Sequence, residues 1–255
     1  MRPDRGILLC AALVAGCAPG AAPQGTTQDP DSIHATAAAE HAMSGMSMPL
    51  GVEDLHMKLT PERPAAPGDS ARAAALVTRM RSSLAKYRDV RAAEADGFRQ
   101  FLPGLKNQPL YHYTKRLWAL EATMRFDPDH PTSLLYQRGS GDSLVLVGAM
   151  YTAPARLSDD DLDQRIPLAV ARWHEHVNWC IPPRGAVQRW RDSTGGRPVF
   201  GPQSPIATAA ACTAAGGRFL PRIFGWMVHV NAFASDDPRV IWAVHHHEGM
   251  EEMHH

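Results

Sequence analysis

The segment RWHEHVNWC, residues 172–180, contains two histidines separated by one residue, His174 and His176. In a β-strand, alternate side chains point to the same face, and residues i and i+2 lie about 7 Å apart at Cα. Two imidazoles placed in this way can bind one metal ion. In an α-helix they would diverge by about 200°, because each residue turns the helix by about 100°. The spacing therefore indicates a metal site only if the segment is a strand.

A second segment repeats the tripeptide His-Val-Asn of the first. It is FGWMVHVNAF, at residues 224–233, and its histidine is His229. If both segments are strands of one sheet, His229 shares a face with His174 and His176. Three imidazoles are a usual ligand set of an open metal site, in which a further position remains for water or substrate. The sequence therefore predicts a three-histidine metal site on one face of a sheet.

Three further polar residues extend this candidate site. His112, in the aromatic-flanked YHY at 111–113, is the next candidate ligand. Asn178 and Asn231 end the two His-Val-Asn tripeptides and are candidates to orient the imidazoles by hydrogen bonds. His-x-His also occurs by chance. The alternative interpretation is that these histidines form hydrogen bonds within the sheet or with water and bind no metal.

Both segments alternate in the way that half-buried strands do. In the first, Trp173, Val177, Trp179 and Ile181 share an apolar face that only Glu175 interrupts. The apolar face of the second consists of Phe224, Trp226, Val228, Val230 and Ala232. The histidines and asparagines lie on the opposite face in each segment, so the pattern favours strands for both.

The rest of the chain supplies a hairpin and helices that would support such a sheet. Apolar residues recur every three or four positions between Asp69 and Gly97, which predicts one long helix that Gly97 ends. The sequences TSLLYQR and SLVLVGAMYTA flank the turn sequence GSGD and predict a β-hairpin. Shorter helices are predicted in KRLWALEATMRF, after the cap residue Ser158, and in an alanine-rich stretch that ends at Gly216.

These elements predict a single α+β domain over residues 67–243. In it an antiparallel sheet is packed by a long N-terminal helix and by shorter helices. The chain has 26 Lys plus Arg and 26 Asp plus Glu, so no charge excess indicates a nucleic-acid partner. The sequence contains no glycine-rich phosphate loop and no Gly-x-Ser-x-Gly motif.

Residues 1–16 have the features of a lipoprotein signal peptide. Two arginines precede an apolar stretch that is too short to span a bilayer as a stable helix, and this stretch ends in VAGC at Cys17. The ending resembles the lipobox of bacterial lipoproteins, in which the cysteine is lipidated. Ala18, rather than Asp, follows the cysteine, so we expect a periplasm-facing protein that a lipid anchors to the outer membrane. The alternative is a plain secretory signal.

Cysteine use agrees with an oxidising compartment. Cys10 leaves with the signal peptide and Cys17 carries the lipid, which leaves Cys180 and Cys212. A disulfide between these two residues is expected, and a pair of thiolate metal ligands is the alternative.

Two segments of low complexity flank the predicted domain. Residues 17–66 are rich in Ala, Pro, Gly, Ser and Thr and predict a disordered tether, and residues 244–255 predict a flexible tail. Both contain methionine and histidine, which together suit copper. We call the tether and the tail the two arms. The predicted arm ligands are His41, Met43, Met46, Met48, His245, His246, His247, Met250, Met253, His254 and His255. The tether also contains His56 and Met57. The alternative is neutral drift in a spacer.

Several segments taken together resemble an uncharacterised family of secreted bacterial proteins and lipoproteins. They include YHYTKRLWALEATMRFDPDHPTSLLYQR, RWHEHVNWC and FGWMVHVNAF, and the resemblance covers about residues 75–240. Many members have a longer His-Met-Gly run before the YHY-like segment. This chain has KNQPL there, so no ligand role of that extra histidine carries over. The resemblance implies one compact α+β domain in an extracytoplasmic setting and implies no established reaction.

The sequence thus favours an extracytoplasmic metal-binding lipoprotein. Its cofactor would be a metal ion, with copper expected and zinc as the other candidate. Its partners would be that ion and, through the lipid anchor, the membrane. Two alternatives remain open: a metal-dependent enzyme, hydrolytic or oxidative, that uses the same histidines, and an envelope binding module whose histidines have no role.

Overall fold

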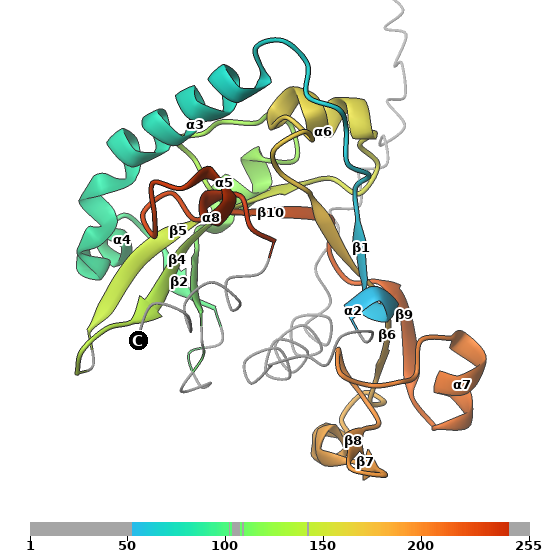
Figure 1. Ribbon diagram of the computed structural model, residues 1–255. Coiled ribbons are helices and arrows are strands. Elements are labelled where there is room, and N and C mark those ends of the chain that lie inside the picture. The colour runs from blue at the N-terminus through green and yellow to red at the C-terminus, as the bar shows by residue number, and fades with distance from the viewer. Residues whose placement is uncertain (1–52, 102, 104–107, 109, 142, 245–255) are drawn as a thin grey trace, which may run out of the picture.

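The computed structural model describes residues 53–101, 103, 108, 110–141 and 143–244. They form an α+β domain in which helices pack on an antiparallel sheet (Figure 1), so the predicted fold class is confirmed. No helix in these ranges is both long enough and apolar enough to cross a membrane. Outside them lie the predicted lipidation site Cys17 and the predicted arm ligands His41, Met43, Met46, Met48, His245, His246, His247, Met250, Met253, His254 and His255.

The sheet has eight strands in the order β1-β6-β10-β5-β4-β3-β2, and β9 also pairs with β6. They are β1 (Met57–Leu59), β2 (Arg99–Gln100), β3 (Tyr111–Thr114), β4 (Ser133–Arg138), β5 (Leu144–Ala153), β6 (His174–Ile181), β9 (Arg218–Arg222) and β10 (Trp226–Val230). A separate pair consists of β7 (Ser193–Thr194) and β8 (Arg197–Pro198). Both His-Val-Asn segments contribute strands, β6 and β10. These strands are neighbours, with Met227 opposite His174.

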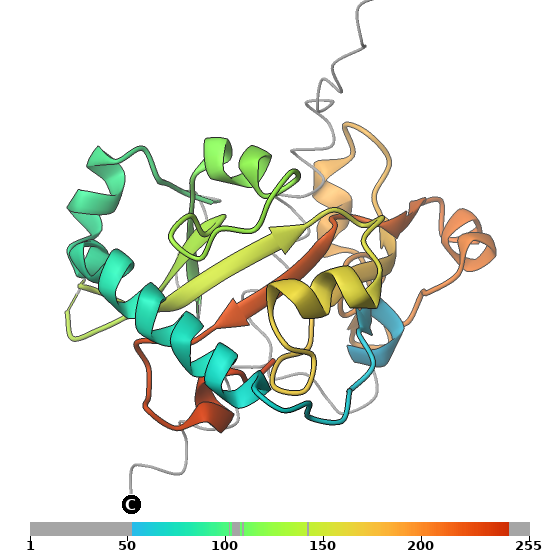
Figure 2. The ribbon, with the colours of Figure 1, turned by 90° about the horizontal axis from the view of Figure 1, so that it is seen from above.

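The helices are short except for one. They are α2 (Glu53–His56), α3 (Asp69–Leu84), α4 (Val90–Ala95), α5 (Arg116–Glu121), α6 (Asp159–Arg165), α7 (Ala209–Ala214) and α8 (Pro238–Ile241), with 3₁₀ turns η1 (Ala85–Arg88) and η2 (Val187–Arg191). Figure 2 shows α3 and α6 lying across one face of the sheet.

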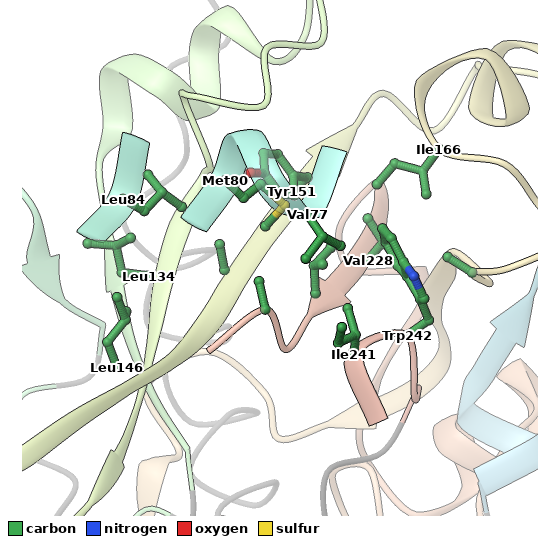
Figure 3. Packing of buried hydrophobic residues seen from close by; sticks show 14 of the residues in the cluster. Val77, Met80, Leu84, Leu134, Leu146, Tyr151, Ile166, Val228, Ile241 and Trp242 are labelled. Carbon is green, nitrogen blue, oxygen red and sulfur yellow. The ribbon is translucent and has the colours of Figure 1, made fainter. Parts of the chain in front are cut away.

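The main hydrophobic core lies between α3 and the sheet. The buried stripe of α3 consists of Ala73, Val77, Met80 and Leu84, which recur at helical spacing. They share one cluster with Leu134 of β4, Tyr151 of β5 and Val228 of β10 (Figure 3). The apolar faces of the strands are therefore turned towards α3.

The long helix predicted from Asp69 to Gly97 is interrupted. Asp89 has an extended backbone (φ −88°, ψ 111°), and its carboxylate accepts a hydrogen bond from the backbone N–H of Arg91, so it caps α4. An aspartate that can bond to the backbone in this way competes with a continuous helix. The prediction of one helix is therefore wrong at this point. Gly97 does end the helical region, at φ 92°.

Other local predictions are confirmed. β4 and β5 pair as an antiparallel hairpin, with a register shift between Leu135 and Tyr136. The hydroxyl of Ser158 accepts a hydrogen bond from the backbone N–H of Asp161. In return, the Asp161 carboxylate accepts one from the backbone N–H of Ser158. The two bonds form a capping box at the start of α6. α7 is followed by Gly216 at φ 66°.

The tether predicted up to residue 66 extends too far along the chain. β1 pairs with the start of β6, with Met57 opposite His176 and Leu59 opposite His174. Beyond β1, the Thr60 N–H donates to the Trp173 carbonyl, and the Trp173 N–H donates to the Thr60 hydroxyl. The domain therefore begins before residue 67. A three-residue strand is too short to produce a clear alternating pattern, and its position depends on the partner strand.

A chain that starts at residue 67 is expected to be less stable than one that starts at residue 53. The shorter chain loses the β1–β6 ladder and the Thr60 bonds, which should lower the free energy of unfolding by about 2 to 3 kcal/mol. Urea denaturation of both chains measures this difference. Equal midpoints would show that β1 contributes nothing to the fold.

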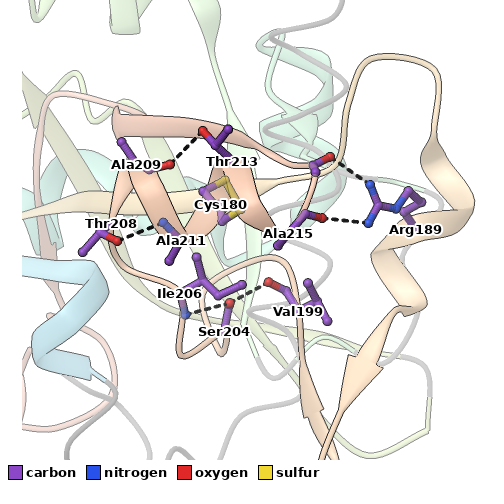
Figure 4. The surroundings of a disulfide bond; sticks show 12 residues. Cys180, Arg189, Val199, Ser204, Ile206, Thr208, Ala209, Ala211, Thr213 and Ala215 are labelled. Atoms are coloured by element: carbon purple, nitrogen blue, oxygen red, sulfur yellow. Dashed lines mark hydrogen bonds between the residues drawn. A yellow bond between two sulfur atoms is a disulfide. The ribbon is translucent and has the colours of Figure 1, made fainter.

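A smaller lobe surrounds a disulfide between Cys180 of β6 and Cys212 of α7 (Figure 4). The predicted pairing is confirmed. Both sulfurs lie against Gly217, where a Cβ would be 2.5 Å from Cys180 Sγ, so this position requires glycine. The Arg189 guanidinium donates to the carbonyls of Ala215 and Gly216 and holds the end of α7 in place.

Candidate metal centre

The predicted ligands lie on the sheet face opposite the main core. Trp173, next to β6, is buried in that core, as are Val228 and Val230 of β10 and both tyrosines of β3. Alternation along each strand therefore places the intervening histidines on the other side. We call this side the histidine face. It is defined by His112, His174, His176 and His229.

The four imidazoles form a chain of ring contacts. The ring centroids of His174 and His176 are 5.5 Å apart, and those of His174 and His229 are 5.4 Å apart. The fourth ring, that of His112, lies 5.6 Å from His229. Two imidazoles on one tetrahedral ion have ring centres roughly 5 Å apart, given metal–nitrogen bonds of about 2.0 Å. The rings are therefore spaced as ligands that can share an ion.

The contact between His112 and His229 reveals the shape of this face. Their strands, β3 and β10, are separated by β4 and β5, a distance of about 14 Å in a flat sheet. Contact between the two rings therefore requires the sheet to curve towards the histidine face. Gly148 of β5 permits this, because a Cβ there would lie 2.3 Å from the carbonyl oxygen of Val230.

The imidazole nitrogens do not converge in this arrangement. Among the described His, Cys, Asp and Glu residues, the only group of three whose ligand atoms all lie within 4.8 Å of one another is Glu121, Asp127 and His130. Metal binding on the histidine face therefore requires the rings to rotate about their side-chain bonds.

Burial keeps two of these imidazoles neutral. The pKa of His112 is lowered to about 4 by burial, an effect that a backbone hydrogen bond with Leu110 opposes in part. The pKa of His176 is lowered to about 4, first by burial and then by the neighbouring His112 and His56. A metal ligand must present a free lone pair. At neutral pH these two histidines can therefore bind a metal ion without first losing a proton.

His56 is a fifth histidine near this face, although the sequence places it in the tether. It is 2% exposed, and its Nε2 lies 2.6 Å from the Ser204 carbonyl oxygen. A carbonyl only accepts, so Nε2 carries the proton and Nδ1 has the lone pair. That buried Nδ1 has no hydrogen-bond partner. Such a group costs about 1 to 3 kcal/mol, and a bound ion would remove this cost.

The two asparagines that were predicted to orient the imidazoles bond to backbone carbonyls. The Asn178 amide donates to the Leu55 carbonyl, and that of Asn231 donates to the Val240 carbonyl. Asn178 also has a positive φ of 59°, which asparagine tolerates better than most residues and which interrupts the alternation of β6. The observed bonds therefore position segments of chain next to the histidine face.

Glu175 interrupts the apolar face of β6 and is fully buried there. Its carboxylate lies 2.9 Å from Arg222 Nε and 3.9 Å from Lys58 Nζ. Burial raises its pKa, and the two cations act in the opposite direction. Since Glu175 lies between two histidines along the strand, it points away from the histidine face.

The group of Glu121, Asp127 and His130 is an ion-pair network. Arg125 pairs with both carboxylates, and His130 Nδ1 lies 2.8 Å from Glu121 Oε2. The His130 ring stacks on Trp118 at 4.4 Å between centroids. Arginine already neutralises these carboxylates, so a metal would have to displace it. The backbone N–H of Asp129 donates to Asp127 Oδ1, a bond typical of a local turn.

No protein-family model matches the chain, and no curated protein or solved structure matches it either.

Proposed function

We propose that this protein is a metal-binding lipoprotein of the bacterial cell envelope, with copper as its metal. The single observation that supports this most strongly is the chain of four imidazoles on one sheet face, with centroid separations of 5.4 to 5.6 Å. The low pKa values of His112 and His176 support it, because neutral imidazoles are ready to bind.

The composition of the flanking segments supports copper over zinc. Met43, Met46 and Met48 precede the domain, and Met250 and Met253 follow it, each set close to histidines. Thioether sulfur binds Cu(I) well and is a poor ligand for Zn(II). We propose that these arms capture and pass on ions and that the histidine face holds one ion more tightly. The reason is that ligands on a sheet are preorganised, so less entropy is lost when they bind.

His174→Ala and His229→Ala are each expected to lower the metal affinity of the tightest site in the full chain by about 100-fold or more. Loss of a group that only hydrogen-bonds to a metal ligand already lowers affinity by about 10- to 100-fold, and these variants remove a ligand itself. His174 and His229 are suitable because each contacts two other rings of the chain. The measurement is competitive titration of Cu(I), Cu(II) and Zn(II) against a chromophoric chelator.

The matched control is His130→Ala, which removes a histidine that stacks on Trp118 within a different network. It should leave the tightest site unchanged, and the weak arm sites should persist in all three variants. Equal affinities of the tightest site in wild type, His174→Ala and His229→Ala would contradict a site on the histidine face.

A further inference from the structure

Three methionines lie opposite the three histidines of β6 and β10. Met57 of β1 is the cross-strand partner of His176, and Met227 of β10 is the partner of His174. The third, Met150 of β5, is the partner of His229. Directly opposite residues have side chains on the same face, with Cβ atoms about 4.5 to 5.5 Å apart. All three thioethers therefore belong to the histidine face.

These methionines differ from the methionine in the core. Met80 of α3 is 1% exposed and packs in the main cluster, where methionine fills a gap between apolar side chains. Met227 is also buried, but neither it nor Met57 or Met150 belongs to a hydrophobic cluster of the described residues. The three methionines therefore do not fill gaps in the main cluster as Met80 does.

The ligand set on this face carries no negative charge in the part that the structure describes. Imidazole and thioether are neutral, and Glu175, the carboxylate of β6, lies on the opposite face with Arg222 and Lys58. The cost of burying an ion rises steeply with its charge. A neutral, partly buried set therefore favours a monovalent ion over a divalent one.

We propose that the histidine face, extended by His56 and by Met57, Met150 and Met227, binds copper as Cu(I). This inference rests on the proposed metal-binding function and specifies its oxidation state and its sulfur ligands. Two independent observations carry it: the register that pairs each methionine with a histidine, and the buried Nδ1 of His56, which has no hydrogen-bond partner. Thioether sulfur is a soft ligand that selects Cu(I), whereas imidazole accepts either oxidation state.

The test is the triple variant Met57→Leu, Met150→Leu, Met227→Leu in the full chain. Leucine nearly preserves volume and hydrophobicity and removes the sulfur. Anaerobic competition titration should show Cu(I) affinity at the tightest site lowered by about 100-fold, with Zn(II) affinity within about threefold of wild type. Met80→Leu is the matched control, since it makes the same change in the core and should alter neither affinity. His56→Gln retains a donor towards Ser204 and should also weaken Cu(I) binding.

The outcomes separate this inference from the proposed function. If the triple variant binds Cu(I) as tightly as wild type while His174→Ala does not, the methionine ligands are refuted and the histidine site stands. If His174→Ala also binds as tightly, both are refuted.

A second measurement covers the case in which the triple variant does not fold. Wild-type protein with ¹³C-methyl methionine is titrated with half an equivalent of Ag(I), a redox-inert analogue of Cu(I). Each single Met→Leu variant assigns one methyl signal. Shifts of the Met57, Met150 and Met227 methyl signals before those of the arm methionines are expected. Shifts confined to the arms would overturn the proposal.

Discussion

Replacing Cys180 and Cys212 together by alanine is expected to lower the free energy of unfolding by about 3 to 4 kcal/mol. The two residues are separated by 32 positions, so the cross-link closes a long loop and restricts the unfolded chain. The disulfide is fully buried with Phe200 in a cluster of its own, apart from the main core. The other apolar members of this cluster are only partly buried, so the disulfide lies at its centre.

Urea denaturation of the double variant and of wild type measures this difference. Wild type reduced with dithiothreitol is the matched control and should unfold at the same midpoint as the double variant. Hydrogen exchange should show the loss of protection first in α7, which the disulfide ties to β6, and in β9, which follows α7 and pairs with β6. If oxidised wild type and the double variant share one midpoint, the disulfide does not stabilise the fold.

The metal-free protein is expected to lose stability as the pH falls from 6.5 to 4. An ordinary histidine has a pKa of about 6.5 in the unfolded chain, whereas the pKa of His112 and of His176 in the folded protein is about 4. Between these values the unfolded chain binds protons that the folded protein does not, so acid favours unfolding. For His176, which is 7% exposed, the difference of about 2.5 pH units corresponds to about 3 kcal/mol.

The comparison is between wild type and His176→Gln, each unfolded in urea with a chelator present at several pH values from 7 to 4. Glutamine cannot take up a proton in this range, so the variant should lose less stability over the same interval. His112→Gln should also reduce the loss of stability between pH 7 and pH 4. Part of this effect should come from His176, because His112 contributes to the low pKa of His176. Parallel curves for wild type and both variants would refute the burial of neutral imidazoles.

Local sequence patterns determined the elements that carry the candidate site. The alternation around His174 and around His229 predicted β6 and β10, because a strand with one face in the core needs apolar residues at every second position. The GSGD turn predicted the β4–β5 hairpin, and Ser158 predicted the start of α6, since both depend on neighbouring residues alone. The pairing of Cys180 with Cys212 was predicted from the number of cysteines and from the expectation of an oxidising compartment.

Tertiary structure alone decided which of these residues meet. The contact between His112 and His229 depends on the curvature of the sheet across β4 and β5, which no local pattern encodes. The pairing of Met57 with His176 depends on cross-strand register between segments more than 100 residues apart. The sequence places His56 and Met57 in a tether because α2 and β1, which contain them, are too short to give a clear pattern, and β1 becomes a strand only beside β6. The register of the strands and the curvature of the sheet follow from the packing of the whole domain. Which residues share the histidine face can therefore be seen only in the folded chain.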